Sequence, residues 1–320
     1  MKMTDVAVVG GGPAGLSAAI AAGRGGARTV LLDENRTLGG QLRYRLTEVV
    51  RGTGGQSLRP MALAAKLLAD AEDAGVDVRP SSLAWGLFEG KVIAVTGLTD
   101  SYHLRAEAVV IATGSTDLPF PFVGGSLPGV FSARAVQLLL HKHRVLPGRR
   151  FVVLGGGSEA VEVAADIRLA GGDVVAVFDP IDNHDAVVAE GRDGIRTVTL
   201  GGTRYDADIL VIAVGRQPDA ALAFMAGCAG GYAASLGGFV PARSDALCTS
   251  VDGIVIAGDA AGICDVAVAL AEGRLAGTSA AAQVTRGAGR DLEGIREPYA
   301  ALARERIAAT AALQPVFAQE

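Results

Sequence analysis

Short apolar runs separated by glycine turns recur along the chain. Val6–Val9 is an apolar run, Leu16–Ala22 has the composition of a buried helix, and Thr29–Leu32 is a second apolar run. Apolar runs of about four to eight residues bounded by turn residues are typical of buried strands. The amino-terminal segment is therefore predicted to fold as strand, helix, strand.

The same order begins again near the middle of the chain. Phe151–Leu154, Val161–Leu169 and Val174–Phe178 repeat the pattern, and Ile209–Val214 is predicted to be the strand that closes this second unit. Internal repetition of this kind predicts two similar halves.

The last third of the chain continues the pattern of the first. Gly253–Ala257 predicts a strand, an Ala-rich helix should run from about Val266 to Ala282, and residues from about Glu297 to Leu313 have helical spacing. Ala108–Ala112 predicts another strand, and the prolines and glycines from Pro119 to Pro128 favour a loop or crossover between domains.

A glycine turn with the spacing G-x-G-x-x-G joins the first strand to the first helix. Its candidate cofactor-binding residues are Gly10, Gly12, Pro13, Ala14 and Gly15. Such a turn lets a diphosphate approach backbone amides at the positive end of a helix. Asp33, with Glu34 as the alternative, should accept hydrogen bonds from an adenosine ribose. The alternative to nucleotide binding is a purely structural turn.

A second turn, G-x-G-x-x-A, precedes the helix of the second half. Its candidate residues are Gly155, Gly157, Ser158 and Glu159, with Asp179 at the end of the following strand. An acid there favours NAD over NADP because it repels a 2′-phosphate. The segment from Asp179 to Asp208 has barely room for a hairpin. Two interpretations stay open, a site for NAD or an adenine nucleotide and a structural remnant.

These patterns predict an α/β fold of two Rossmann-like dinucleotide-binding domains, each a three-layer ββα arrangement. We expect the first domain to consist of residues 1–116 and 235–320, and a shortened second domain, residues 117–234, to be inserted in it. A chain of 320 residues is long enough for two domains.

Composition narrows the classes of function. The net charge of −5 and the lack of a long basic cluster argue against nucleic acid as a partner. No apolar stretch of about 20 residues suggests a membrane span. Cys228, Cys248 and Cys264 form no CxxC pair and no metal set, which favours a reducing, cytoplasmic setting and a role as buried small apolar groups. His141 and His143 are interpreted as solvated linker residues.

Several segments together resemble the two-dinucleotide-binding flavoproteins of thioredoxin reductase type. They are Gly39-Gly40-Gln41, Ala112-Thr113-Gly114, Gly215-Arg216-Gln217-Pro218 and Gly258-Asp259. The resemblance implies FAD as cofactor, with Gly40 and Gln41 beside the isoalloxazine and Asp259 at the ribityl and pyrophosphate region. The helix that starts near Val266 would stabilise reduced flavin through its positive end, or serve only as a packed core element.

The thioredoxin reductase type carries a redox-active CxxC that this sequence lacks, so dithiol chemistry is not expected. Leu236–Pro241, Ala271–Gly277 and the tail Arg304–Phe317 are more similar to the FAD-binding alpha subunits of heteromeric amine and amino-acid dehydrogenases. These include opine oxidase, hydroxyproline dehydrogenase and hydrogen cyanide synthase.

The resemblance implies a hetero-oligomer in which a beta subunit of D-amino-acid-oxidase type oxidises the substrate and this chain handles electrons. The family often continues into a cysteine-rich 2Fe-2S domain that is not present here, which leaves a separate small 2Fe-2S subunit or no cluster. Two other functions stay open, a self-sufficient NADH-dependent flavoprotein reductase or oxidase and a non-catalytic nucleotide-binding structural subunit.

Overall fold

The structure, a computed structural model, describes residues 1–44, 58–180, 187–285, 294, 296, 299–301 and 303–311. The chain divides into two compact units. Unit 1 comprises Met1–Ser115 and Gln217–Glu320, and unit 2 comprises Thr116–Arg216. The chain leaves and re-enters unit 1 through β7 (Ser115–Asp117) and β15 (Arg216–Pro218), which pair with each other.

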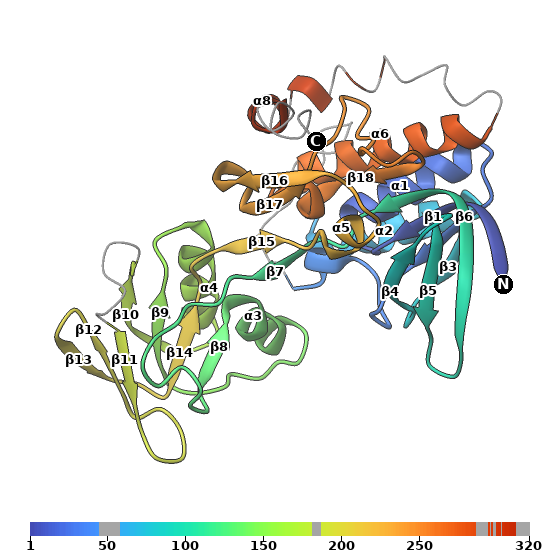
Figure 1. The fold of residues 1–320 in the computed structure, drawn as a ribbon. Coiled ribbons are helices and arrows are strands. Elements are labelled where there is room, and N and C mark those ends of the chain that lie inside the picture. Colours follow the sequence, from blue (N-terminus) through green and yellow to red (C-terminus); the bar gives the residue numbers. More distant parts are fainter. Residues whose placement is uncertain are drawn as a thin grey trace. The chain divides into compact units, whose positions relative to one another are not determined.

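Unit 1 is built on a seven-stranded sheet with the order β3-β2-β1-β6-β5-β4, and β18 also pairs with β6 (Figure 1). The strands are β1 (Lys2–Val9), β2 (Thr29–Leu32), β3 (Asp77–Arg79), β4 (Leu83–Phe88), β5 (Val92–Thr96), β6 (Ser101–Ile111) and β18 (Ile254–Ile256). The pairs among β1, β2, β3, β6 and β18 are parallel, whereas β4 and β5 form antiparallel pairs.

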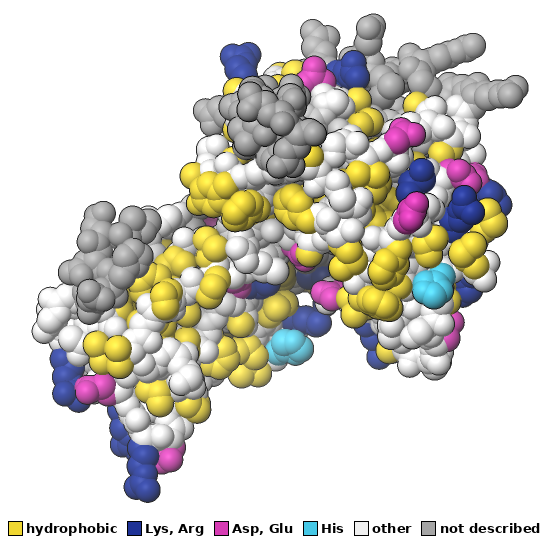
Figure 2. Space-filling view, viewed as in Figure 1, with side chains coloured by type: hydrophobic (Ala, Val, Ile, Leu, Met, Phe, Trp, Pro, Cys, Tyr) yellow, Lys and Arg dark blue, Asp and Glu magenta, His cyan; other side chains and the backbone are white. Residues whose placement is uncertain are grey.

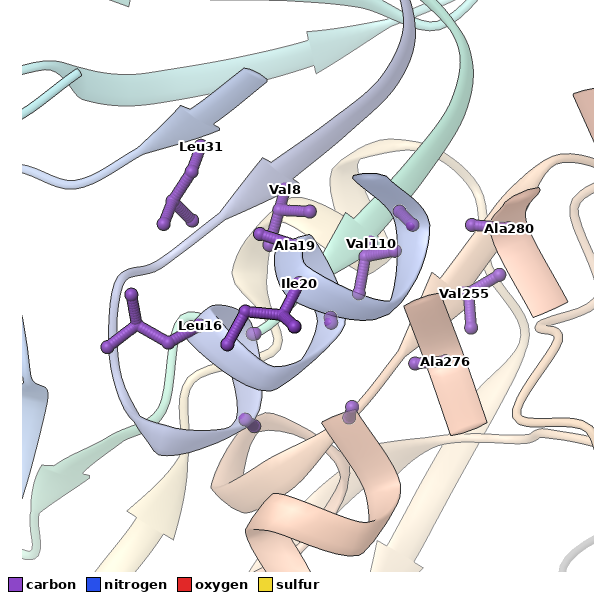
Figure 3. Packing of buried hydrophobic residues seen from close by; sticks show 14 of the residues in the cluster. Val8, Leu16, Ala19, Ile20, Leu31, Val110, Val255, Ala276 and Ala280 are labelled. Atoms are coloured by element: carbon purple, nitrogen blue, oxygen red, sulfur yellow. The ribbon is translucent and has the colours of Figure 1, made fainter. Parts of the chain in front are cut away.

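Alternation along β1 separates the two faces of this sheet. Val6 and Val8 point into one apolar core, whereas Ala7 and Val9 belong to another on the opposite face. The first core packs against α1 (Pro13–Arg24), α2 (Pro60–Asp73) and α6 (Val266–Val284). Figure 3 shows residues of α1 and α6 meeting strand residues such as Val110 in this core.

The opposite face is covered by the β4–β5 strands and by α5 (Ala221–Met225). Leu87 and Ile93 supply this second core from the antiparallel strands, and Leu222 and Ala223 supply it from α5. The helices thus cover one face of the parallel strands, and on the other face the antiparallel end of the same sheet and α5 close the second core. The remaining elements of the unit are η1 (Gly40–Arg43), β16 (Gly230–Ala233), η3 (Ala234–Leu236), β17 (Gly238–Pro241), η4 (Gly258–Ala261) and α8 (Arg304–Ala311).

Unit 2 repeats the plan at smaller size. Its four-stranded parallel sheet has the order β10-β9-β14-β8, and a separate antiparallel sheet has the order β11-β12-β13. The elements are β8 (Val130–Ser132), α3 (Ala133–His141), β9 (Arg150–Leu154), α4 (Ser158–Leu169), β10 (Asp173–Phe178), β11 (Val187–Glu190), β12 (Thr197–Leu200), β13 (Thr203–Asp206) and β14 (Ile209–Ile212). Val153 and Val211 face the helices, whereas Val152 and Leu210 face the antiparallel sheet.

The α/β fold class is confirmed, with a parallel sheet in each unit. The return from unit 2 to unit 1 falls after Arg216, whereas the sequence prediction puts it after Ala234. The difference has a packing cause, because Leu222, Ala223 and Cys228 lie in the unit 1 core. Three short strands, β11, β12 and β13, lie between Asp179 and Asp208, where the spacing predicts barely a hairpin.

Candidate flavin and nucleotide sites

The first glycine turn brings the end of β1, the end of β6 and the start of α1 together. Gly10 has a φ of +104°, and a Cβ on Gly10 would lie 2.2 Å from the carbonyl oxygen of Ala112. A Cβ on Gly15 would lie 1.7 Å from the carbonyl oxygen of Gly10. Both positions therefore exclude a side chain, because strand and helix approach at backbone distance.

The amino terminus of α1 is open to a ligand. Gly12 is its N-cap and gives no side-chain cap, and a Cβ on Gly12 would have only the Gly40 Cα within 4 Å, at 3.9 Å. By contrast, the side chains of Ser132 and Asp265 cap α3 and α6. A helix start with bare backbone amides and space before it fits the diphosphate of a dinucleotide.

Asp33 directly follows β2, as predicted, and it supports the turn itself. Its carboxylate accepts a hydrogen bond from the Gly11 N–H at 2.6 Å and another from the Asn35 N–H at 2.7 Å. The residue is buried, whereas Glu34 is exposed. Each carboxylate oxygen has a further lone pair, so Asp33 can also accept from a ribose hydroxyl.

Three polar side chains from distant segments meet in unit 1. The Gln41 amide donates to the Asp259 carboxylate at 2.7 Å, and the Ser115 hydroxyl donates to the same oxygen at 2.9 Å. The other Asp259 oxygen accepts from the Cys264 N–H at 3.0 Å. Gln41 directly follows Gly40, which lies against Gly12, so this cluster adjoins the first glycine turn. The turn and the cluster together fit a diphosphate and a polyol chain, the parts that FAD presents.

The helix α6 begins at Val266, where the sequence places it. Its N-cap Asp265 accepts a hydrogen bond from the Val268 N–H at 2.8 Å. Cys264 lies just before this cap with its sulfur 3.5 Å from an Asp259 oxygen. Burial raises the pKa of the Cys264 thiol well above its ordinary value, so the group is a neutral thiol.

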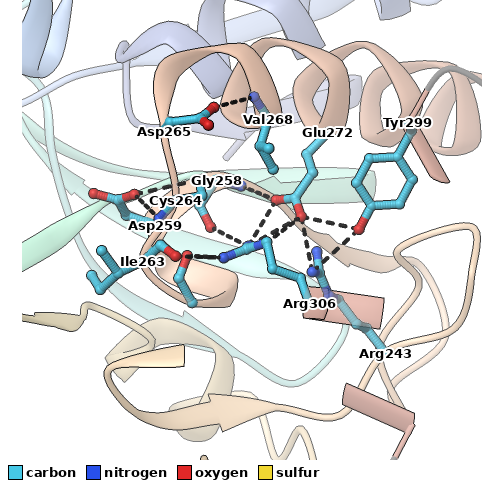
Figure 4. Close-up of polar contacts among 11 residues, drawn as sticks. Arg243, Gly258, Asp259, Ile263, Cys264, Asp265, Val268, Glu272, Tyr299 and Arg306 are labelled. Carbon is cyan, nitrogen blue, oxygen red and sulfur yellow. Dashed lines mark hydrogen bonds and ion pairs between the residues drawn. The ribbon is translucent and has the colours of Figure 1, made fainter. Parts of the chain in front are cut away.

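A buried charge cluster supports the turn that carries Asp259 (Figure 4). Glu272 on α6 is fully buried and accepts from the Gly258 N–H at 2.7 Å and from Arg243 at 2.9 Å. Arg306 and the Tyr299 hydroxyl also donate to it, each at 3.1 Å. Burial alone would raise the pKa of the Glu272 carboxyl, but the two arginines outweigh burial and lower it.

The second glycine turn repeats the backbone of the first. Gly155 has a φ of +147°, and a Cβ on it would lie 2.0 Å from the Ala213 carbonyl oxygen. Gly157 is the N-cap of α4, with no side-chain cap and no atom within 4 Å of an added Cβ. A Cβ on Gly156 would meet the Asp179 carboxylate, which therefore lies beside the turn as Asp33 lies beside the first. Ser158 and Asp179 are exposed.

An acidic side chain stands in the first turn of α4. Burial raises the pKa of the Glu159 carboxyl, and Arg216, whose nearest nitrogen lies 3.9 Å away, only partly offsets this effect. Arg134 and Asp117 lie 3.3 Å apart in the same unit and also act on Glu159. Glu159 therefore ionises less readily in the folded protein than an exposed glutamate does.

The structure brings most of the predicted residues of the first site together. Ala112 lies against the Gly10 turn, Thr113 donates to the Asp219 carbonyl oxygen at 2.5 Å, and the Gly114 carbonyl accepts from the Asp219 N–H. The predicted second-site residues gather in unit 2. The sequence prediction missed Ser115, Glu272, Arg243, Tyr299 and Arg306.

His141 corrects one interpretation from the sequence. It is the last residue of α3 rather than a solvated linker residue, and its imidazole is buried 3.1 Å from the Asp166 carboxylate. The cysteines also differ in part from expectation, since Cys248 and Cys264 are only partly buried. Burial nevertheless raises the pKa of all three thiols, so none is a ready thiolate.

Two other kinds of feature are missing from the described part of the chain. Within residues 1–44, 58–180, 187–285 and the described tail, no three His, Cys, Asp or Glu side chains gather as a metal site would require. No helix in the same residues is both long and apolar enough to cross a bilayer.

The fold and the first turn define a dinucleotide-binding protein with two related units. Residues 4–183, more than half of the chain, match the family model of pyridine nucleotide-disulphide oxidoreductases. The chain belongs to this family. It is an FAD-dependent oxidoreductase or a subunit of one.

Several known proteins are similar over most of this chain. The alpha subunit of sarcosine oxidase from a Corynebacterium species is 32% identical over 87% of this chain and 32% of its own length. A second relative is an opine oxidase component from Rhizobium meliloti, its A subunit, which is 29% identical over 86% of this chain and 62% of its own length. The chain thus spans less than two thirds of either relative.

A solved structure extends the similarity. The L-proline dehydrogenase from P. horikoshii superposes with a TM-score of 0.78 and 25% sequence identity, covering 92% of this chain and 59% of that one. The predicted likeness to FAD-binding subunits of amine and amino-acid oxidising enzymes is confirmed by these relatives. The substrate and the subunit role of this chain are a separate question.

Proposed function

We propose that this chain is the electron-handling, FAD-binding alpha subunit of a heteromeric amine or amino-acid dehydrogenase. The observation that carries the proposal is the meeting of Gln41, Ser115 and Asp259 beside the open amino terminus of α1. Such a site would suit the diphosphate and ribityl chain of FAD, and two proteins similar to this chain are named as subunits of oxidases. The substrate class is an opine, hydroxyproline or glycine-type amino acid.

The chain's own residues would bind and orient the cofactor. The amides of Ala14 and Gly15 would hold the diphosphate, Asp33 would hold the adenosine ribose, and Asp259 with Gln41 would hold the ribityl chain and the edge of the flavin ring. The start of α6 at Val266 adds positive potential near the flavin. When bound, FAD supplies the electron-accepting chemistry, and the protein supplies position and electrostatics.

An exposed aromatic pair supports a protein partner. Tyr232 on β16 and Phe239 on β17 are 63% and 64% exposed, with ring centroids 5.3 Å apart. Figure 2 shows hydrophobic side chains gathered over this hairpin. Exposed aromatic residues are enriched where proteins associate. A beta subunit of D-amino-acid-oxidase type is the partner we propose, with a small 2Fe-2S subunit as a further component.

Co-expression tests the proposal. The chain is produced with the proteins encoded beside it, purified through a tag on this chain, and assayed for amine-dependent dye reduction with opines, hydroxyproline, sarcosine and glycine. We expect a stable hetero-oligomer that contains FAD and is active with one of these substrates. The Gly12→Asp variant is the matched control and should be inactive without loss of its partner. A monomer that never gains activity would contradict the proposal.

The intact geometry of the second glycine turn favours one alternative, an NADH-dependent flavoprotein reductase. Asp179 would hold the adenosine ribose of NADH, and the open N-cap at Gly157 would hold its diphosphate. Rapid mixing with NADH separates the two functions, because fast bleaching of the flavin supports the reductase and no bleaching removes it. If bound flavin never cycles during turnover of any assembly, the chain is a structural nucleotide-binding subunit.

A further inference from the structure

The two arginines of the buried cluster make different contacts. Arg306 donates hydrogen bonds from all three of its side-chain nitrogens. Its Nη1 donates to the carbonyl oxygens of Gly262 at 2.5 Å and Ile263 at 2.9 Å. Its Nη2 donates to the Gly258 carbonyl oxygen at 3.3 Å, and its Nε donates to Glu272. Arg243 contacts Glu272 and Tyr299 through Nη2, and its buried Nη1 has no hydrogen-bond partner among the described residues.

The three carbonyl groups belong to one turn, Gly258–Cys264, that carries Asp259. Glu272 holds the Gly258 N–H while Arg306 holds the Gly258 carbonyl, so both backbone polar groups of this residue are bound to the cluster (Figure 4). Asp259 follows directly and takes hydrogen bonds from Gln41 and Ser115. A backbone fixed on both sides of Asp259 restricts where its carboxylate can lie.

We propose that Arg306 is a positioning residue for the flavin site, holding the Gly258–Cys264 turn through its carbonyl oxygens and thereby placing the Asp259 carboxylate. The inference rests on FAD binding at the first glycine turn. It assigns the tail around α8, far from the glycine turn in sequence, to the cofactor site. Arg243 has a separate role, because its hydrogen bonds go to the side chains of Glu272 and Tyr299 and it contributes charge to the cluster.

The chemistry of the guanidinium explains why this position needs arginine. Its planar fork can serve several acceptors in fixed directions at once, whereas a lysine ammonium is a compact charge on a flexible stem. Lysine at position 306 would keep the positive charge beside Glu272 but could not reach all of the Gly258, Gly262 and Ile263 oxygens. Substitution by lysine therefore separates the effect of the charge at position 306 from the effect of the hydrogen bonds that hold the turn.

The test uses the whole chain with four substitutions: Arg306→Lys, Arg306→Gln, Arg243→Gln and Arg304→Gln. Arg304 is exposed two residues before Arg306 on the same helix α8 and is the control for a lost charge in the tail. Each protein is stripped of flavin and titrated with FAD, and the midpoint potential of the reconstituted flavin is measured by spectroelectrochemistry. Circular dichroism and thermal melting of the flavin-free proteins report the fold.

We expect Arg306→Lys to weaken FAD binding by about tenfold, as the loss of aligned hydrogen bonds would, with little change in midpoint potential because the charge is kept. Arg243→Gln should shift the midpoint potential to more negative values, since a buried positive charge that favours reduced flavin is gone, while FAD affinity stays within about threefold. Arg304→Gln should behave as wild type, and Arg306→Gln should show both changes.

Failure of the proposal and failure of the flavin assignment can be told apart. If Arg306→Lys binds FAD as tightly as wild type, or if Arg243→Gln loses as much FAD affinity as Arg306→Lys, Arg306 supports the fold only and does not position Asp259. A wild-type protein that takes up no FAD would refute the flavin assignment itself. If Arg306→Gln does not fold, Arg306→Lys still tests the proposal. We expect FAD to dissociate from Arg306→Lys about tenfold faster than from wild type, and an unchanged rate would contradict the proposal.

Discussion

The two glycine turns share one backbone geometry and differ in their surroundings. In each, a strand ends at a glycine of positive φ packed against a neighbouring strand, and a helix begins at a bare glycine N-cap. Asp33 is buried beside the first turn, whereas Asp179 is exposed beside the second. Beside the first turn, Gln41 and Ser115 converge on Asp259 through hydrogen bonds. Beside the second turn, Arg216 and Arg134 act on the charge of Glu159 instead. The motif thus specifies the turn, and the rest of the chain decides what kind of site surrounds it.

The largest expected effect concerns the charge cluster behind the first turn. Glu272→Gln leaves Arg243 and Arg306 buried without their carboxylate, and losing one partner of a buried ion pair costs about 3–5 kcal/mol of unfolding free energy. Denaturant unfolding at neutral pH measures the loss. Glu159→Gln is the matched substitution in unit 2 and should cost far less. Equal losses would contradict the difference between the turns.

The pH dependence of wild-type stability gives a second view of Glu272. Because its folded pKa is lowered, its stabilisation is complete above the ordinary carboxyl pKa of 4.5 and is lost as pH falls through the lower folded value. We expect the unfolding free energy of the wild type to fall more steeply below this pKa than that of Glu272→Gln. Unfolding curves recorded over a series of acidic buffers measure the slope, and parallel slopes would count against the ion pair.

Asp substitutions at the two N-caps compare the turns as ligand sites. Gly12→Asp places a carboxylate against the diphosphate position, and like charges in close contact should weaken FAD binding at least about 100-fold, or about 2.8 kcal/mol. The fold should persist, because Gly12 has extended backbone angles and Asp is a good N-cap. Flavin fluorescence titration measures the affinity.

Gly157→Asp is the matched control in unit 2, with almost the same backbone angles. It should leave FAD affinity unchanged and abolish any binding of NAD or ADP. Loss of FAD from Gly157→Asp, or retention of FAD by Gly12→Asp, would show that the flavin does not bind at the first glycine turn.

Glu159→Gln is expected to have the smallest effect. A carboxylate in the first turn of α4 opposes a diphosphate there, and partly exposed charges interact by about 0.5–1 kcal/mol. We therefore expect ADP or NAD to bind about two- to fivefold more tightly to the variant at neutral pH. Because the folded pKa of Glu159 is raised, wild type and variant should converge as pH falls below that value. Calorimetry that finds no nucleotide binding in either protein would leave unit 2 as a structural remnant.

Local patterns predicted the framework well. The second strand is Thr29–Leu32 in sequence and structure alike, and α6 begins at Val266 as predicted. Apolar runs, glycines of positive φ and a helix start are encoded by neighbouring residues. These features carry the fold and the glycine turns without help from distant segments.

Contacts between distant segments could not be predicted from the sequence. Arg243, Glu272 and Arg306 are ordinary charged residues in their local context, and only folding shows that they share one buried site. Ser115 likewise follows a recognised segment but gains its role from Asp259. His141 lies in a stretch that looks polar, yet α3 buries one face of it against α4. Residues that pair across long stretches of chain leave no local pattern in a single sequence.

The hydrogen bond between Gln41 and Asp259 joins residues 218 positions apart, with all of unit 2 between them. The ribosome synthesises the chain from its amino terminus, and domains generally fold as units during synthesis. The whole of unit 2 is therefore available to fold before Asp259, and later Arg306, leaves the ribosome. With the proposed site, flavin capture would be a late event in biogenesis, because a nascent chain halted before residue 259 would have the glycine turn but no Asp259 to complete the site.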